Sequence, residues 1–272
     1  MPIFQRGSYP TYYEDTGGGD PIVLVCGLSA DLQVWRFQVA ELSKTYRIVT
    51  FDNRGAGRSG APDEPYTITQ MANDLAALLD HLQIPTAHLL GWSMGGVIAQ
   101  SFALTHPTRV HQLLLLGTFT AADGYLHEAI SNWRNMRRSN MPYEQTVRHL
   151  ARMVYSPNLA RNPTAYEAFV QVMLANPYRQ TDHGFFRQAE ALLAYKAPPT
   201  LAEQRLPTSI LVGEHDQLTP RYMSEELAAA LPGASLQVLP GAHAGFLEYP
   251  NDYNQAILNI LRGGSPRDLL GR

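Results

Sequence analysis

The first part of the chain alternates short apolar runs with segments whose apolar residues recur at helical spacing. Four runs bounded by turn residues are predicted to be buried strands, at residues 22–26, 48–51, 87–90 and 113–116. The segments between them contain Val39, Leu75 and Ile98 at helical spacing. Strands and helices in this alternation predict a parallel sheet with helices on both faces.

The same alternation returns near the C-terminus, with strands predicted at residues 210–212 and 236–239 and helices around Leu227 and Ile257. Between residues 119 and 200 the strand pattern disappears, and helical patterns are interrupted by prolines. We interpret residues 119–200 as a helical lid inserted into an α/β core that comprises residues 1–118 and 201–262. Residues 263–272 are expected to be a flexible tail.

Composition narrows the class of protein further. The 272 residues are enough for one large domain, and the hydrophobic content of 45% is typical of a folded globular protein. A net charge of −3 gives no reason to expect nucleic acid as a partner. The single cysteine, Cys26, excludes an internal disulfide. The first residues do not resemble a secretion signal and the apolar runs are too short to span a bilayer, so we expect a cytoplasmic protein without membrane contact.

A candidate nucleophile follows the third predicted strand. Residues 91–95, Gly-Trp-Ser-Met-Gly, fit the pattern G-x-S-x-G between a strand and a helix. A serine on such a tight turn is held in a strained backbone conformation, which requires small neighbours two residues away on each side. Gly91 and Gly95 meet this requirement. The pattern therefore predicts that Ser93 is a nucleophile beside the N-terminus of a helix.

This turn, in the stretch GWSMGG, and the stretch DNRGAGRSG at residues 52–60 resemble the α/β-hydrolase superfamily over nearly the whole chain. With GLSADLQVW at residues 27–35, they are similar to the 3-oxoadipate enol-lactonase-like esterases and lactonases of its serine hydrolase branch. The resemblance implies an α/β-hydrolase fold: a mostly parallel eight-stranded sheet flanked by helices, with a helical lid inserted between its two halves. It also implies that the turn holding Asp52 and Arg54 is structural.

The base that accepts the serine proton is predicted to be His243. Imidazole alone takes a proton from a serine near neutral pH and returns it to a leaving group. His243 lies in a loop after the last predicted strand, and loops at the carboxyl ends of parallel strands carry catalysis in such folds. The family's histidine has the same place. The other eight histidines are expected to be surface or core residues.

The carboxylate that orients the base is predicted to be Asp216, which follows the strand at residues 210–212 and a glycine, as in the family pattern. The order Ser93, Asp216, His243 is the one expected of this fold. Glu214 and His215 compete only by proximity. Asp123 is an alternative, because some relatives carry the acid after an earlier strand.

The oxyanion hole is predicted to consist of two backbone amides, those of Met94 and Leu28. Many relatives have His-Gly where this chain has Cys26-Gly27. The difference does not affect the hole, because the backbone supplies the donor. Cys26 is expected to be a small buried hydrophobic residue.

Substrate-binding residues are predicted at Trp92, Trp133, Phe186 and Arg187. The lid has further aromatic residues and methionines, of which we expect more than half to pack its own core: Phe169, Phe185, Met136 and Met153. Its arginines could bind a carboxylate on the substrate, although solvated helix faces are the expected place for most of them: Arg134, Arg137, Arg138, Arg148 and Arg152.

The chain is therefore expected to hydrolyse a small-molecule carboxylic ester, thioester or lactone through an acyl-enzyme on Ser93, as a monomer or homodimer. No metal or organic cofactor is implied, since no ligand cluster or phosphate-binding loop is evident. Serine at this turn argues against dehalogenases and epoxide hydrolases, which use aspartate there. Two alternatives stay open: hydrolysis of a carbon–carbon bond in a vinylogous diketone, and a ligand-binding signalling protein with slow turnover.

Overall fold

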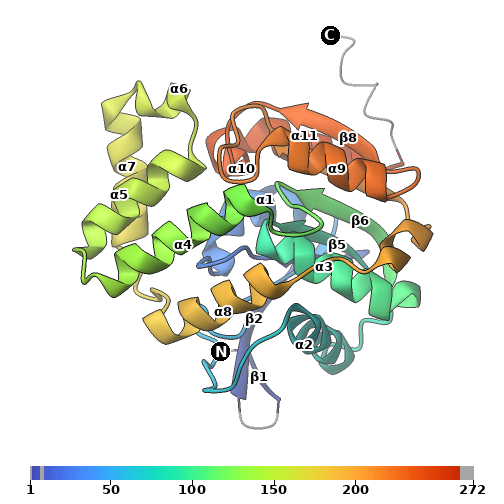
Figure 1. Cartoon of the computed structure of the whole chain (residues 1–272). Helices are drawn as coiled ribbons and strands as arrows, with labels where there is room; N and C mark the ends of the chain where they lie inside the picture. The colour runs from blue at the N-terminus through green and yellow to red at the C-terminus, as the bar shows by residue number, and fades with distance from the viewer. Residues whose placement is uncertain (1, 7–8, 264–272) are drawn as a thin grey trace.

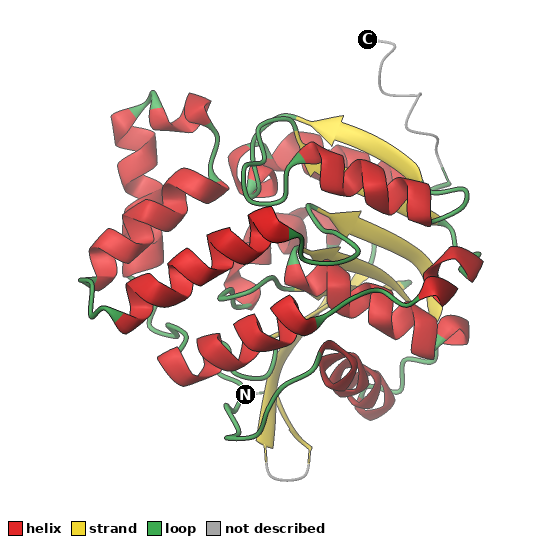
Figure 2. Ribbon diagram, viewed as in Figure 1, coloured by secondary structure: helices red, strands yellow, loops and turns green. Residues whose placement is uncertain are grey.

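The computed structural model describes residues 2–6 and 9–263, which form one eight-stranded sheet with helices on both faces (Figures 1 and 2). The strands are β1 (Ile3–Arg6), β2 (Tyr9–Thr16), β3 (Pro21–Val25), β4 (Arg47–Phe51), β5 (Ala87–Trp92), β6 (Val110–Leu116), β7 (Thr208–Gly213) and β8 (Ser235–Leu239). The predicted tail, residues 263–272, lies outside the described residues except for Gly263.

The strand order is β1-β2-β4-β3-β5-β6-β7-β8, and all pairs from β4 to β8 are parallel. β1 and β2 pair antiparallel with their neighbours at one edge. The eight-stranded, mostly parallel sheet is thus confirmed. Six strands match the predicted positions within three residues, and β1 and β2 supply the two that the apolar pattern did not locate.

Helices occur where apolar residues recur at helical spacing. They are α1 (Arg36–Leu42), α2 (Ile68–His81), α3 (Met94–Thr105), α4 (Gly124–Arg138), α5 (Tyr143–Val154), α6 (Pro157–Ala160), α7 (Pro163–Leu174), α8 (Asp182–Ala194), α9 (Arg221–Ala230), α10 (Gly245–Glu248) and α11 (Pro250–Leu261). Three short 3-10 helices accompany them: η1 (Leu32–Trp35), η2 (Pro107–Arg109) and η3 (Pro199–Glu203). No helix of the described part is long and apolar enough to cross a membrane.

Alternation along the strands divides the core between the two faces of the sheet. In β3, Val23 and Val25 pack with residues of α2, α3 and α9, whereas Ile22 and Leu24 pack with residues of α1 and α11. Successive side chains of a strand point to opposite faces, so a strand that is apolar throughout must be covered on both. The central strands are therefore held rigidly, and their carboxyl ends are fixed relative to one another.

Helices α4–α8 lie between β6 and β7 in sequence, and α5, α6 and α7 stand together at one side of the molecule (Figure 1). Side chains of α4 and α8 join the apolar cluster of α2 and α3, those of α7 join that of α1 and α11, and those of α5 contribute to both. Prolines begin α6 and α7 at their first positions, where the missing amide hydrogen removes no helical hydrogen bond. The α4–α8 segment thus packs against both clusters.

Candidate active site

The turn between β5 and α3 places Ser93 at the carboxyl edge of the sheet. Ser93 has φ 55° and ψ −121°, a conformation that non-glycine residues rarely adopt and that is often found at functional sites. The turn is closely packed: a Cβ on Gly91 would collide with the backbone of Gly95, and a Cβ on Gly95 with the carbonyl oxygen of Val25. Both glycines are therefore required by the turn, which agrees with the steric reason for expecting them.

Asp216 and His243 follow the neighbouring strands β7 and β8 and meet at the same edge. His243 Nδ1 lies 2.8 Å from Asp216 Oδ2, and the side chains are 2% and 0% exposed. The other carboxylate oxygen accepts hydrogen bonds from the backbone amides of Leu218 and Thr219, at 2.9 and 2.8 Å. A carboxylate held in this way fixes the orientation of the imidazole and can stabilise it when it becomes charged.

Thr219 adds a contact that sequence reasoning missed. Its hydroxyl donates to Asp216 Oδ2 at 2.9 Å and lies 3.0 Å from His243 Nδ1. Gly117, at the end of β6 with φ 50°, lies behind the pair, and a Cβ there would come within 3.3 Å of both Asp216 Oδ2 and His243 Nδ1. The backbone oxygen of His243 accepts a hydrogen bond from Trp92 Nε1 at 2.9 Å, which ties the histidine loop to the nucleophile turn.

Ser93 and His243 face the same small cavity of about 40 Å³. Its walls are mostly apolar: Gly27, Leu28, Trp92, Phe119, Leu126, Ile130, Trp133, Val154, Leu192 and Leu218. Within the described structure no hydrogen bond joins the serine hydroxyl to the imidazole. Such bonds are often long in enzymes without substrate and shorten when substrate binds.

The two predicted oxyanion donors flank Ser93. Gly27 lies so close that a Cβ on it would be 3.1 Å from Ser93 Cβ, and the following residue, Leu28, lines the same small cavity as the serine. Met94 is the first residue of α3, so its amide has no acceptor within the helix. Among the described residues, neither amide donates a hydrogen bond to the protein. Both are available for an oxygen that becomes negative at this site.

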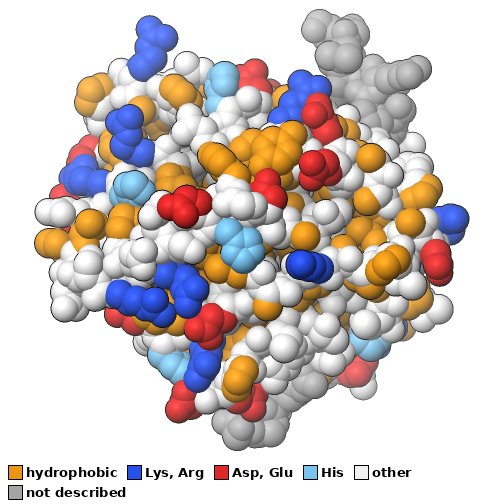
Figure 3. Space-filling view, in the orientation of Figure 1, with side chains coloured by type: hydrophobic (Ala, Val, Ile, Leu, Met, Phe, Trp, Pro, Cys, Tyr) orange, Lys and Arg blue, Asp and Glu red, His pale blue; other side chains and the backbone are white. Residues whose placement is uncertain are grey.

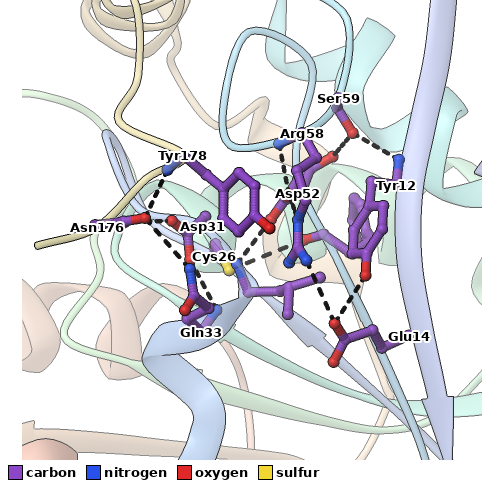
Figure 4. Close-up of polar contacts among 12 residues, drawn as sticks. Tyr12, Glu14, Cys26, Asp31, Gln33, Asp52, Arg58, Ser59, Asn176 and Tyr178 are labelled. Atoms are coloured by element: carbon purple, nitrogen blue, oxygen red, sulfur yellow. Dashed lines mark hydrogen bonds and ion pairs between the residues drawn. The ribbon is translucent and has the colours of Figure 1, made fainter. Parts of the chain in front are cut away.

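Residues 26–31, here called the β3 loop, are held by side chains distant in sequence. Asn53 Nδ2 donates to the oxygen of Cys26 at 2.9 Å, and the amide of Leu32, directly after the loop, donates to Asp52 Oδ1 at 2.8 Å. Asp31 accepts a hydrogen bond of 2.6 Å from Asn176 Nδ2, which comes from the connection between α7 and α8 (Figure 4). The α4–α8 segment therefore contacts the loop that carries the Leu28 amide.

The stretch at residues 52–60 is structural in its contacts. The second oxygen of Asp52 accepts from the amide of Arg58 at 2.8 Å, and burial raises the pKa of Asp52. The Arg58 guanidinium lies 3.6 Å from the ring centroid of Tyr12 and 4.3 Å from that of Tyr178 (Figure 4). Arg54 makes a two-pronged ion pair with Asp74, at 2.6 and 2.9 Å. The roles expected for Asp52 and Arg54 fit these contacts.

Cys26 is fully buried at the end of β3, and its sulfur lies 3.9 Å from the oxygen of Phe51. Burial is the largest of the causes that raise the pKa of its thiol well above the ordinary value. A protonated, inaccessible thiol is unsuited to nucleophilic catalysis. This environment fits the expected role of Cys26 as a small hydrophobic residue.

A second, larger cavity of about 410 Å³ opens beside the small one. Leu28, Trp92, Trp133 and Val154 line both cavities, so the two adjoin. The large cavity extends between the β3 loop and helices α4, α5 and α7, and its further lining includes Val147, Leu150, Tyr155, Phe169 and Met173. It has the size and the mostly apolar character of a small-molecule site.

Two of the four predicted substrate-binding residues lie away from these cavities. Trp92 and Trp133 line both, whereas Phe186 and Arg187 line neither. Phe186 packs against Phe185 and lies under the Arg138 guanidinium, and Arg187 pairs with Asp63 at 3.4 Å. The prediction for these two is corrected because α8 turns Phe185, Gln188, Ala189 and Leu192 inward.

The other residues singled out in the α4–α8 segment mostly follow the expectation of packing and solvent exposure. Of the remaining aromatic residues and methionines, Phe169 lines the large cavity, while Phe185, Met136 and Met153 belong to the apolar cluster. Arg134 and Arg148 pair with glutamates on the surface. Basic side chains gather on the side formed by α4–α8 (Figure 3).

The rival acids are engaged elsewhere. Asp123 caps α4, where it accepts from the amide of Leu126 at 2.9 Å, and its other oxygen accepts from the Tyr222 hydroxyl. Glu214 and His215 are about half exposed and lie 3.5 Å from one another. Among these candidates, Asp216 alone touches the His243 ring.

The fold, with Ser93, Asp216 and His243 at the carboxyl ends of parallel strands, is that of the alpha/beta hydrolases. Residues 20–250 match the family model described as alpha/beta hydrolase fold, so the chain belongs to that family. It is 33% identical over 263 residues to the RutD protein of Azorhizobium caulinodans, which is provisionally named a carbamate hydrolase; the match covers 96% of this chain and 98% of that protein.

Solved structures extend the comparison. The enol-lactonase from Burkholderia xenovorans LB400 superposes with a TM-score of 0.86 at 26% identity, covering 96% of this chain and 100% of that one. A thermophilic esterase from Thermogutta terrifontis does so with a TM-score of 0.82 at 30% identity, covering 94% of each chain. This chain is therefore similar to hydrolases named for carbamate, lactone and ester substrates.

Proposed function

We propose that the chain is a serine hydrolase that cleaves small-molecule carboxylic esters, lactones or thioesters through an acyl-enzyme on Ser93. One observation carries the proposal: the Asp216–His243 pair, joined at 2.8 Å, faces the same small cavity as a serine held at φ 55°. A hydroxyl, an imidazole and a buried carboxylate in this order are the parts of nucleophilic acyl transfer.

The proposed reaction has two halves. His243 takes the proton of Ser93 as its oxygen attacks the carbonyl carbon, and the amides of Leu28 and Met94 stabilise the oxygen that becomes negative. The carbon–oxygen bond to the alcohol breaks, and His243 gives its proton to the leaving alkoxide. Water then repeats the attack on the acyl-enzyme, so that acid is released and the serine is restored.

The α4–α8 segment is proposed to serve as the lid of this site. Its residues Trp133, Val154 and Leu192 line the small cavity, and Asn176 holds the β3 loop. Helices above the serine exclude water from the reacting atoms and give the site its shape. Substrate choice is therefore expected to depend on this segment.

The test is a panel of p-nitrophenyl esters, γ-lactones, thioesters and aryl carbamates, measured with the wild type, Ser93→Ala, His243→Ala and a matched control, His215→Ala. We expect turnover of at least one class by the wild type and His215→Ala, and a loss of at least about 10³-fold in kcat for the other two variants. Turnover of carbamates alone would refute the assignment to esters, lactones or thioesters and would agree instead with the name of the RutD relative. Unchanged turnover in Ser93→Ala would refute the proposal.

A further inference from the structure

The two cavities beside Ser93 differ about tenfold in volume, about 40 against about 410 Å³. At 10–15 Å³ for each water-sized group, the small cavity holds about three such groups. The large one has room for a medium-sized chain or a ring. The boundary between the two spaces is formed by the residues that line both: Leu28, Trp92, Trp133 and Val154. A substrate that reacts at Ser93 therefore places a short end in the small cavity and a long end in the large one.

The proton transfer decides which end is short. His243 gives its proton to the leaving oxygen, so that oxygen must lie within hydrogen-bond reach of the imidazole. Ser93 and the imidazole line the small cavity and not the large one, whereas Leu28, whose amide is proposed to bind the carbonyl oxygen, lines both. The large cavity lies instead beside the β3 loop, from Leu28 to Asp31. This arrangement directs the leaving alcohol into the small space and the acyl chain into the large one.

The polar groups of the large cavity favour an uncharged acyl chain. Arg137 is paired with Asp182 at 2.8 Å, and Asp31 is hydrogen-bonded to Asn176 at 2.6 Å. Arg36 lies at an exposed position of the lining, with its guanidinium 4.4 Å from the ring centroid of Phe37. The remaining walls are mainly aliphatic and aromatic, and they would stabilise apolar carbon by about 0.8 kcal/mol for each buried CH₂.

We propose that the preferred substrates are esters of a small alcohol, with one or two carbons, and an apolar acid of about six carbons or more. This inference rests on the proposed function, because it assigns the two ends of the substrate by the roles of Ser93 and His243. The reaction consumes one water molecule and releases the long acid and the short alcohol.

Three isomeric esters test the assignment, because they have the same composition and differ only in where the carbonyl lies: methyl octanoate, butyl pentanoate and heptyl acetate. We expect kcat/KM for methyl octanoate to exceed that for heptyl acetate at least tenfold, with butyl pentanoate between them. Equal values, or a preference for heptyl acetate, would overturn the inference.

The proposed function is tested separately in the same assay. Loss of all turnover in Ser93→Ala supports it whichever isomer is preferred. If the wild type hydrolyses other panel substrates but none of the three isomers, the inference on the acyl and alcohol ends is wrong while the proposed function stands. If it hydrolyses no ester, lactone or thioester, both fail.

Two variants locate the preference in the two cavities. Ile130 lines only the small cavity, and Met173 lines only the large one. Ile130→Ala should raise kcat/KM for butyl pentanoate relative to methyl octanoate at least threefold, and Ile130→Val should do so more weakly if the alanine variant fails to fold. Met173→Trp should lower methyl octanoate turnover at least fivefold while methyl propanoate turnover stays within twofold. The opposite pattern would reverse the assignment of the two spaces.

Discussion

Gln188 of α8 joins the proposed lid to the β3 loop. Its replacement by leucine should have two effects that can be measured independently, one on the free energy of unfolding and one on kcat. The side chain is fully buried. Its Nε2 donates to the oxygen of Arg54 at 2.8 Å, and its Oε1 accepts from Gln180 Nε2 at 2.8 Å and, at 3.4 Å, from the amide of Ser29. Ser29 follows Leu28 and has φ 62°, a conformation that its surroundings must maintain.

The expected magnitudes follow from these contacts. Leucine has nearly the volume of glutamine, so the variant creates little empty space. Two short hydrogen bonds are lost, at about 0.5–1.5 kcal/mol each, and the oxygen of Arg54 is left buried without its partner, which adds about 1–3 kcal/mol. We expect Gln188→Leu to lower the free energy of unfolding by about 2–6 kcal/mol, measured by urea denaturation at a fixed temperature.

The effect on catalysis should be distinct. Loss of a complete oxyanion donor typically lowers kcat by about 10²–10³-fold, and a loosened β3 loop displaces the Leu28 amide without removing it. We therefore expect kcat to fall about tenfold at 15 °C, where the variant is folded, with KM changed less than threefold. The control is Gln171→Leu, because Gln171 lies on the exposed face of α7, where its side chain donates to Glu167. A variant that loses stability but keeps the wild-type kcat would refute the coupling of lid and loop.

Three further predictions concern other buried groups. Asp74→Leu leaves the Arg54 charge buried without its main partner, so the free energy of unfolding should fall by about 3–5 kcal/mol in urea denaturation; a fall below about 1 kcal/mol would contradict this. Burial raises the pKa of the Cys26 thiol, so a disulfide reagent at pH 8 should label no thiol in the native protein and one in guanidinium chloride. Burial lowers the pKa of His88 below its ordinary 6.5, so the unfolded chain binds the proton first and stability declines as the pH falls through 6.5. His88→Gln should reduce that decline between pH 7.5 and 5.5 in thermal melts. The same slope of melting temperature against pH in the variant and the wild type would contradict the assignment.

The parts of the site that sequence reasoning could predict are those set by local rules. Ser93, Asp216 and His243 each follow a predicted strand, and neighbouring parallel strands end at one edge of a sheet, so their proximity follows from strand order. The glycines around Ser93 are required by the turn itself. β1 and β2 lacked a comparable signal because they lie at an edge and include polar residues, as in the pattern YPTYYEDT.

Residues that connect the α4–α8 segment to the sheet have no such local signal. Asn176 and Gln188 are polar residues that a helical or turn pattern assigns to the surface, yet they contact Asp31 and Ser29 through pairings more than 140 residues apart. Gln188 is buried and Asn176 is half-buried. Their positions follow from how helices α4–α8 dock, which depends on the summed packing of two apolar clusters rather than on any one segment. Thr219 was within reach, since a hydroxyl three residues after a buried carboxylate commonly bonds back to it.

The error at Phe186 and Arg187 shows how one helix face decides the chemistry of the site. The inward positions of α8 are Phe185, Gln188, Ala189 and Leu192, which follow the helical repeat of three and four residues. A prediction of the inward face that is wrong by one residue selects Phe186, which lies under Arg138, in place of Phe185, which packs on Trp133. Because Leu192 lines the small cavity from the same face, the size of the space beside Ser93 depends on the rotation of α8. The sheet therefore determines where the reacting groups lie, and the docking of α4–α8 determines how much room each end of a substrate has beside them.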